Sequence, residues 1–292
     1  MGLDVPEGPR FGVGTAVFGD LEPEDVELVA ALGFPGLEPY RQWVTRYLDR
    51  PAELRRLLDA NGVAMITCSN GGPGQSTDFI DPAVRAATIA DHVGFAQRFL
   101  SEFGCRHFKI NLGSRPPGGT TEAQLTAIAE ALNDLGREVA ALGIRLAPHP
   151  HIWGPVERPE EIRRLLELTD PEYVSLTLDT AQVRLGGGDP IELLEGHWDR
   201  IVALHWKDTG PGYRSWTGPT PTREEHEREC LYKDLGAGGI DFCRIWRLLR
   251  ERDYRYWITL DLDPPRPEEG PVEEKLRRNA RFLRERLSVT TF

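Results

Sequence analysis

The sequence predicts a single closed α/β TIM barrel, a (β/α)8 barrel of eight parallel strands surrounded by helices. Eight short apolar runs recur along the chain, and nearly all are followed by a helical run. This alternation of strand and helix is typical of a parallel sheet. A chain of 292 residues has the usual length of one barrel domain. An open, doubly wound sheet is the alternative, but no G-x-G-x-x-G fingerprint follows the first strand. We therefore expect residues 1–292 to form one domain.

The clearest strand–helix–strand unit lies between Glu172 and Asp208. Its two apolar runs are short, and the first is rich in Val, Leu and Thr, as buried parallel strands tend to be. Asp189 and Pro190 between them predict the N-cap and first residue of a helix. The eight expected strands are Phe11–Ala16, Phe34–Pro39, Val63–Cys68, Cys105–Leu112, Ile144–Pro148, Tyr173–Leu178, Ile201–Leu204 and Tyr254–Leu260.

Prolines and glycines mark the ends of the expected helices. Proline is favoured at the first helical position, and glycine is favoured just after the last one. Thr121 and Gln124 have the spacing of a capping box. The expected helices run from Pro23 to Gly33, from Pro51 to Ala60, from Asp81 to Gly104, from Thr121 to Gly143, from Pro159 to Leu168, from Pro190 onward, and from Pro271 to Leu287.

The composition excludes several classes of protein. The net charge of −11 and the pI near 5.2 argue against a nucleic-acid-binding surface, which is normally basic. No apolar run approaches the length that spans a membrane, and the N-terminus MGLDVPEGPR lacks the apolar stretch of a signal peptide. The four cysteines form no C-x-x-C pair, and Cys68 and Cys105 are expected to be buried thiols. We expect a cytoplasmic protein with a small-molecule partner.

One segment departs from the alternation of strands and helices. Residues 209–239 are rich in Gly, Pro and charged residues. A segment this long inside a compact domain is usually functional. Because it follows His205 at the end of the seventh strand, we expect it to lie over the barrel mouth. A contact between subunits of a homo-oligomer is the alternative.

Four side chains that suit a metal ion follow four successive strands. His149, Asp179, His205 and Asp261 come at the ends of strands five, six, seven and eight. Neighbouring strands lie about 4.8 Å apart, so these side chains can converge at the carboxyl end of the barrel. Two imidazoles and two carboxylates suit Mn²⁺, Zn²⁺, Fe²⁺ or Co²⁺. Such an ion acts as a Lewis acid on vicinal oxygens and stabilises an enediolate. For any one of these residues, a helix-capping or other structural role is the alternative.

The same residues lie in motifs that resemble a known family. The run LDTAQVRLGGGDPIELLEGHWDRIVALHWKD is similar to the xylose isomerase-like superfamily of sugar phosphate isomerases and epimerases. Three features resemble its inosose (2-keto-myo-inositol) dehydratases most: His149-Pro150-His151 followed by Trp153-Gly154, the segment LTDPEYVSLTLDT, and LGAGGIDF. The resemblance implies a carbohydrate-metabolising barrel with a divalent metal, manganese being the first expectation and zinc, cobalt or iron the alternatives.

The resemblance also implies roles for individual residues. Asp179 matches the aspartate of the L-D-T motif, and His205 the histidine of the H-x-K-D motif, which Lys207 and Asp208 complete. Three positions depart from the family. Asp261 and His149 stand where glutamates are usual, and Gln182 stands where a histidine is common. Loss of both glutamates removes the usual acid/base pair of the isomerases and disfavours epimerisation through that pair.

Elimination of water from a keto-polyol needs a base and an acid. His151 and His149 are the candidates for these roles because imidazole titrates near neutral pH. Lys207 is a third candidate, which either neutralises Asp179 or binds a substrate oxygen. Lys109 and Glu38 lie on strands, where an inward substrate contact and an outward structural position are both open. The remaining histidines, including His107, are expected to be structural. The expected substrate contacts are Glu38, Lys109, Gln182, Trp153 and Asp263.

Three functions follow. The first is a metal-dependent lyase (dehydratase) acting on a cyclic keto-polyol or keto-sugar, as in the inosose dehydratases. The second is a metal-dependent isomerase or epimerase of a free or phosphorylated sugar. The third is a non-catalytic barrel that binds a sugar or a partner subunit, for which the substitutions His149, Gln182 and Asp261 are the reason.

Overall fold

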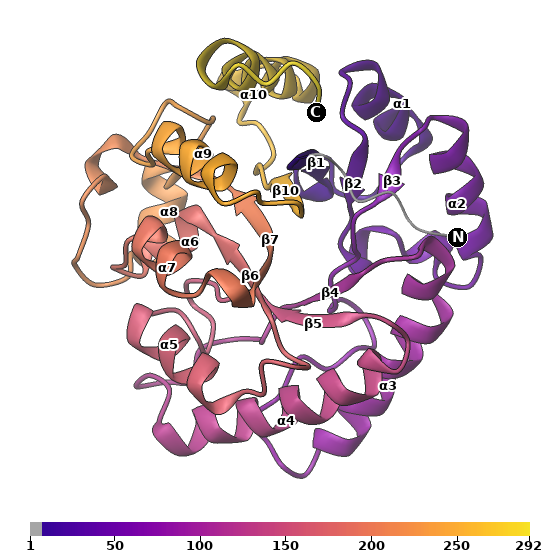
Figure 1. The fold of residues 1–292 in the computed structure, drawn as a ribbon, viewed down its shortest axis with the longest axis vertical. Helices are drawn as coiled ribbons and strands as arrows, with labels where there is room; N and C mark the ends of the chain where they lie inside the picture. The colour runs from indigo at the N-terminus through magenta and orange to yellow at the C-terminus, as the bar shows by residue number, and fades with distance from the viewer. Residues whose placement is uncertain (1–7) are drawn as a thin grey trace.

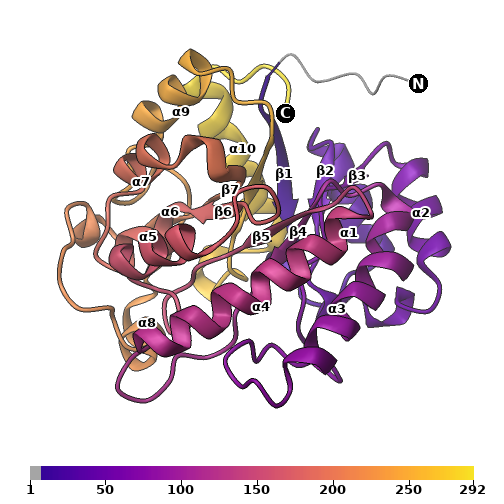
Figure 2. The ribbon, with the colours of Figure 1, turned by 60° about the horizontal axis from the view of Figure 1, so that its bottom comes forward.

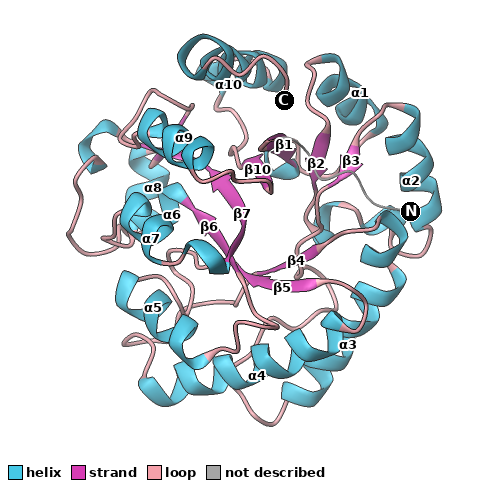
Figure 3. Cartoon of the chain, viewed as in Figure 1, coloured by secondary structure: helices cyan, strands magenta, loops and turns pink. Residues whose placement is uncertain are grey.

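The computed structural model describes residues 8–292 and shows a (β/α)8 barrel, so the predicted fold class is confirmed. The barrel strands are parallel and surround a central axis, with the helices forming an outer ring (Figures 1 and 3). The strands are β1 (Arg10–Gly14), β2 (Gly36–Glu38), β3 (Ala64–Met65), β4 (His107–Ile110), β5 (Arg145–Pro148), β6 (Leu176–Asp179), β7 (Ile201–Trp206) and β10 (Trp257–Leu260). The helices are α1 (Pro23–Ala31), α2 (Pro51–Ala60), α3 (Arg85–Arg98), α4 (Glu122–Ala140), α5 (Pro159–Leu168), α6 (Thr180–Leu185), α7 (Pro190–Gly196), α8 (Arg223–Glu229), α9 (Phe242–Glu251) and α10 (Val272–Leu287).

Side chains complete the barrel where the ladder of backbone hydrogen bonds is interrupted. Strands β3-β2-β1-β10-β7-β6 form one hydrogen-bonded sheet, and β4-β5 form another. Between β3 and β4, Thr67 Oγ1 donates to the carbonyl of His107 at 2.8 Å. In the same gap the Asn111 amide donates to Asn70 Oδ1 at 2.7 Å. Between β5 and β6, Leu146 and Val174 form an isolated parallel bridge.

Glycines make room for large side chains inside the barrel. A Cβ atom on Gly36 would lie 2.6 Å from Cζ3 of Trp257, and one on Gly12 would lie 2.3 Å from Cδ1 of Ile66. On the outer side of β1, Phe11 packs against Trp246 of α9, with ring centroids 5.5 Å apart. The barrel interior is therefore filled by side chains that reach across neighbouring glycines.

The predicted helix starts agree well with the structure. Proline occupies the start of α1, α2, α5 and α7, and the capping box of Thr121 and Gln124 is present in α4. The exception is the long helix expected from Asp81. Asp78 and Asp81 instead accept hydrogen bonds from nearby backbone amides, which form turns, and α3 begins only at Arg85. Local capping of the backbone by aspartate delays this helix.

The segment of residues 209–239 contains secondary structure of its own. It contains α8 and β9 (Tyr232–Lys233), and β9 pairs in antiparallel fashion with β8 (Asp208–Thr209) at the start of the segment. In Figure 2, α8 lies toward the end of the molecule opposite the start of β1. The Pro221 carbonyl accepts a hydrogen bond from Trp153 Nε1 at 2.7 Å, and the Tyr232 hydroxyl accepts one from Gln182 Nε2 at 3.1 Å. These contacts join the segment to the loop after β5 and to α6.

The structure also tests two further predictions, that Cys68 and Cys105 are buried thiols and that no segment is long and apolar enough to cross a membrane. Cys68 and Cys105 are buried free thiols, as predicted, while Cys230 is half-buried and Cys243 is exposed. Among residues 8–292, no helix has the length and apolar character needed to cross a membrane. The sequence argument about a signal peptide concerns residues that partly lie outside the described range.

The packing at Gly36 predicts that Gly36→Ala destabilises the barrel. The added methyl group would overlap Trp257, and overpacking of this kind costs about 1–3 kcal/mol. Urea denaturation measures the change in the free energy of unfolding. Gly196→Ala is the matched control, since a Cβ at Gly196 meets nothing within 4 Å. Equal stability of the two variants would contradict this account of the barrel interior.

Candidate metal centre

Three buried side chains converge at the carboxyl end of the barrel. His149 follows β5, Asp179 ends β6 and His205 lies on β7. Each offers one ligand atom, and these atoms lie within 4.8 Å of one another. His149 Nε2 lies 3.6 Å from Asp179 Oδ2, and His205 Nδ1 lies 3.8 Å from the same oxygen. The structure therefore brings together three of the four side chains predicted to bind a metal.

Within residues 8–292, these three atoms have no hydrogen-bond partner. His149 Nε2, Asp179 Oδ2 and His205 Nδ1 are all buried, and their contacts with carboxylates or imidazoles are longer than hydrogen bonds. Leaving a buried polar atom unpaired is costly, and native structures rarely do so. Three such atoms around one point fit a cation, which would satisfy all three. A set of two histidines and one carboxylate also leaves coordination positions open, as catalytic metal sites do.

In each of these three side chains, the second polar atom, which does not face the other two ligands, contacts a neighbouring group that holds it in place. Asp179 Oδ1 accepts from the amides of Ala181 and Gln182 and so caps α6. His205 Nε2 lies 2.9 Å from Glu38 Oε1. His149 Nδ1 lies 3.4 Å from the side-chain oxygen of Asn111. Such contacts fix the orientation of metal-binding side chains.

Glu38 is the centre of a buried charged group. Its Oε1 lies 2.6 Å from Lys109 Nζ, and its Oε2 accepts a hydrogen bond from Thr259 at 2.6 Å. Glu38 and Lys109 are both 0% exposed. Burial alone would raise the pKa of Glu38, but the charges of His205 and Lys109 hold it well below its usual value. The carboxylate therefore stays ionised and orients His205.

The two histidines of the cluster differ in protonation. Burial, together with His205 and Lys109, lowers the pKa of His149 well below its usual value. His149 is therefore neutral, the form that binds metals. Burial also acts to lower the pKa of His205, but Glu38 outweighs it and raises the pKa to about 9. A metal ion at Nδ1 would thus replace a proton on His205.

Asp261 lies beside the cluster. Its Oδ2 is 3.5 Å from His205 Nδ1 and 3.3 Å from Lys207 Nζ, and its Oδ1 accepts from the Tyr40 hydroxyl at 3.4 Å. Burial would raise the pKa of Asp261, but Lys207 and His205 hold it well below its usual value. Asp261 is not one of the three residues whose ligand atoms lie within 4.8 Å of one another.

Lys207 links Asp261 to Asp263. Its Nζ lies 2.7 Å from Asp263 Oδ1 and 4.4 Å from the centre of the Tyr232 ring. Burial would lower the pKa of Lys207, but Asp261 and Asp263 raise it well above its usual value. The ammonium group is therefore charged at neutral pH and lies next to the candidate metal ligands.

A cavity of about 210 Å³ opens beside the cluster. His151 lines it together with His149 and Trp153. His151 Nδ1 lies 2.6 Å from the carbonyl of Ile152, which can only accept, so Nδ1 carries the hydrogen and Nε2 does not. Burial, together with His149, lowers the pKa of His151 to about 4.

The expected substrate contacts lie in different surroundings. Trp153 lines the cavity in a left-handed backbone conformation, with φ of 66°. Gln182 accepts a hydrogen bond from the Ile152 amide at 3.3 Å and is 1% exposed. Lys109 and Glu38 face inward, but they lie behind the ring of His205 and are paired with each other. Direct contact of these residues with a substrate stays a prediction.

Sequence reasoning did not single out Tyr40, Asn111, Thr259 or Tyr232, which complete the site. A signal was available for two of them. Tyr40 and Asn111 come two residues after Glu38 and Lys109. Alternate residues of a strand share a face, so continuing each strand by one step predicts that both point to the same side.

Comparison with known proteins identifies the family. A model of the xylose isomerase-like TIM barrel family matches residues 26–286. The chain belongs to this family. The resemblance seen in the L-D-T and H-x-K-D motifs is thereby confirmed at the level of the family.

This xylose isomerase-like barrel is similar to two inosose dehydratases in sequence and to a zinc-containing protein in structure. The inosose dehydratase of Halalkalibacterium halodurans is 29% identical over 209 residues, which cover 68% of this chain and 66% of that protein. The inosose dehydratase of Geobacillus kaustophilus is 35% identical over 148 residues, 49% of this chain and 47% of that protein. These matches span about half to two thirds of the relatives' length. A crystal structure of the IOLI protein with a bound zinc atom has a TM-score of 0.77 and 16% identity, covering 96% of this chain and 98% of that one.

The buried pair of Glu38 and Lys109 predicts that Glu38→Gln is strongly destabilising. The variant leaves Lys109 charged and buried without its carboxylate, which costs about 3–5 kcal/mol. Urea denaturation of the metal-free protein measures the loss. The double variant Glu38→Gln/Lys109→Met removes both charges and is expected to recover much of it. If the single variant unfolds at the same urea concentration as the parent, the pair does not stabilise the barrel.

Proposed function

We propose that this barrel is a divalent-metal-dependent lyase that dehydrates a cyclic keto-polyol or keto-sugar. The observation that carries the proposal is the convergence of three buried ligand atoms, from His149, Asp179 and His205, that lack a hydrogen-bond partner within residues 8–292. The curated relatives described above are named inosose dehydratases, which is consistent with this chemistry. The match to the xylose isomerase-like family and the names of these relatives support a sugar or polyol as the substrate.

His149, Asp179 and His205 would hold the metal, with Asp261 as a fourth ligand after a small movement toward it. Mn²⁺, Zn²⁺, Fe²⁺ and Co²⁺ all accept this mixed nitrogen and oxygen set. When bound, the ion would act as a Lewis acid on vicinal substrate oxygens and favour an enediolate. Burial, together with Asp261, raises the pKa of Asp179, and a cation would favour its ionised form.

His151 is the base in this proposal. Its Nε2 is unprotonated because Nδ1 holds the hydrogen that bonds the Ile152 carbonyl. It lines the cavity beside His149, where the carbon next to a substrate carbonyl would lie. A neutral imidazole in this position can take the proton that elimination removes. His149 was also a candidate, but its Nε2 points into the cluster, which favours a metal-binding role.

Lys207 is the proton donor or oxygen-binding group in this proposal. Its ammonium is held by Asp261 and Asp263 and remains charged. A hydroxyl leaving the substrate needs a proton or a positive charge nearby. Glu38 and Lys109 act as positioning residues, since they lie behind His205 and fix its ring.

An isomerase or epimerase of a free or phosphorylated sugar is the second candidate. The candidate metal ligands and the base on His151 are equally compatible with this reaction, because both reactions pass through an enediolate. The two reactions differ only in what happens after proton removal. A lyase expels a hydroxyl group, whereas an isomerase returns a proton to a different position.

The metal proposal predicts about one Mn, Zn, Fe or Co ion per chain, measured by plasma mass spectrometry on tag-free protein. Asp179→Ala and His205→Ala are expected to lose it. Asp241→Ala is the matched control for the aspartate, because Asp241 also caps a helix but lies outside the cluster. A parent protein without metal that also fails to take up Mn²⁺ or Co²⁺ would refute both enzyme proposals and leave a non-catalytic sugar-binding barrel.

Proton NMR in D₂O, with metal-loaded protein and a panel of keto-polyols, identifies the product and so distinguishes the two reactions. A dehydratase gives a product lighter by one water, and an isomerase gives a product of equal mass apart from deuterium exchange. His151→Asn is expected to lower kcat by about 10²–10⁴-fold, the usual effect of losing a general base. Its metal content should be unchanged, which separates loss of the base from loss of the metal.

A further inference from the structure

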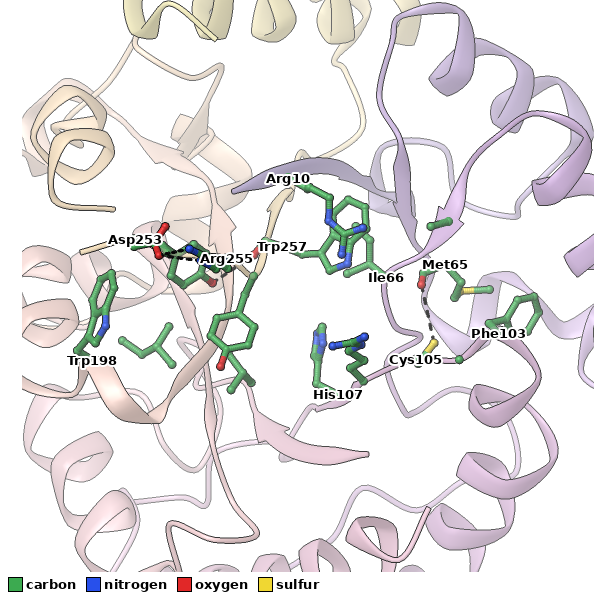
Figure 4. A pocket seen from close by; sticks show the side chains of 17 residues that line it. Arg10, Met65, Ile66, Phe103, Cys105, His107, Trp198, Asp253, Arg255 and Trp257 are labelled. Atoms are coloured by element: carbon green, nitrogen blue, oxygen red, sulfur yellow. Dashed lines mark hydrogen bonds and ion pairs between the residues drawn. The ribbon is translucent and has the colours of Figure 1, made fainter. Parts of the chain in front are cut away.

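A second cavity lies at the other end of the barrel. It has a volume of about 610 Å³ and is lined by residues at the starts of the strands, including Arg10, Arg106, His107, Tyr254 and Trp257. Figure 4 shows Arg10, His107 and Trp257 from different strands lying around this space. It shares no lining residue with the cavity beside the metal cluster. The proposed reaction uses none of its side chains.

Two arginines on this cavity have no carboxylate partner within residues 8–292. Neither the Arg10 nor the Arg106 side chain takes part in a salt bridge or hydrogen bond there, although the chain as a whole carries a charge of −11. The guanidinium of Arg10 lies 4.0 Å from the centre of the Trp257 ring, and its Nε is buried and unpaired. Burial, together with the charge of Arg106, lowers the pKa of Arg10. The carboxylate on the cavity lining, Asp253, is paired with Arg255, so within residues 8–292 it does not pair with Arg10 or Arg106.

His107 adds an unpaired polar atom to the same wall. The side chain is only 5% exposed, and its Nε2 is buried without a hydrogen-bond partner in the described part of the chain. Burial lowers the pKa of His107 to about 4, so the ring is neutral at pH 7 and has one hydrogen to donate. The sequence suggested a structural histidine, but a structural histidine is normally hydrogen-bonded when buried.

We propose that this cavity binds a phosphate monoester of a small organic molecule. Two guanidinium groups and an imidazole match the donor needs of a phosphate, which carries a charge of about −1.5 to −2 at pH 7. A carboxylate has a single charge and would leave one arginine unbalanced. The cavity is much larger than a phosphate group, so space remains for the organic part.

The aromatic side of the cavity suits that organic part. Trp198, Tyr254 and Trp257 line it, and Trp198 and Tyr254 pack edge to face with ring centroids 5.8 Å apart. Aromatic faces pack well on the C–H surface of a sugar or on a planar base. The expected ligand is therefore a sugar phosphate or a nucleoside monophosphate, bound at the end of the barrel away from the metal cluster.

Isothermal titration calorimetry with glucose 6-phosphate, AMP, inorganic phosphate and glucose tests the proposal. At least one of the two esters is expected to bind more tightly than inorganic phosphate, and glucose is not expected to bind. Arg106→Gln should weaken ester binding by about tenfold or more, because it removes a charge-assisted contact. Arg106 is exposed and its side chain has no hydrogen-bond or salt-bridge partner among residues 8–292, so this variant should fold normally.

Two control variants locate the binding. Arg281→Gln removes one exposed positive charge from α10 and is expected to leave ester affinity unchanged. Asp179→Ala disrupts the metal cluster and is also expected to leave it unchanged. Absence of ester binding at millimolar concentration, equal affinity for inorganic phosphate, or full binding by Arg106→Gln would overturn the proposal. Loss of binding in an Asp179→Ala variant that unfolds at the same urea concentration as the parent would place the phosphorylated ligand at the barrel mouth and would equally overturn it.

Discussion

The candidate metal centre depends on one buried chain of charges, Lys109–Glu38–His205. Lys109 keeps Glu38 ionised, and Glu38 holds the imidazole of His205 so that Nδ1 faces His149 and Asp179. Burying a carboxylate in a barrel core is costly unless cations and donors surround it. Here Lys109, His205 and Thr259 all do so. The strand ends are thereby fixed relative to one another across the barrel.

Much of the fold could be predicted from the sequence because its signals are local. Proline at helix starts and a capping box at Thr121 depend on residues close together in the chain, and these predictions are confirmed. Each of the eight apolar runs overlaps a strand, but most strands begin later than predicted, as β6 and β10 do. The convergence of His149, Asp179 and His205 followed from the geometry of parallel strand ends. The late start of α3 was missed because Asp78 and Asp81 compete with the helix for backbone amides.

The roles of Glu38, Lys109 and Asp261 could not be predicted in the same way. Sequence spacing showed that Glu38 and Lys109 were near the mouth, but not that they pair with each other behind His205. Asp261 illustrates the same limit. Its side chain is shorter than the glutamate that the family resemblance leads one to expect at this position, and whether it ligates a metal depends on ångström-scale placement among Tyr40, Lys207 and His205.

Asp208, which completes the H-x-K-D motif, has a consequence for how this barrel can diversify. Its carboxylate accepts hydrogen bonds from the amides of Thr209, Gly236, Gly238 and Ile240, so it fastens both ends of the segment of residues 209–239 at one point. A loop with a fixed base can change in length at small entropic cost. This segment can therefore be exchanged between relatives or by protein engineers, provided that Asp208, the close-packed Gly238 and the site residue Tyr232 are retained.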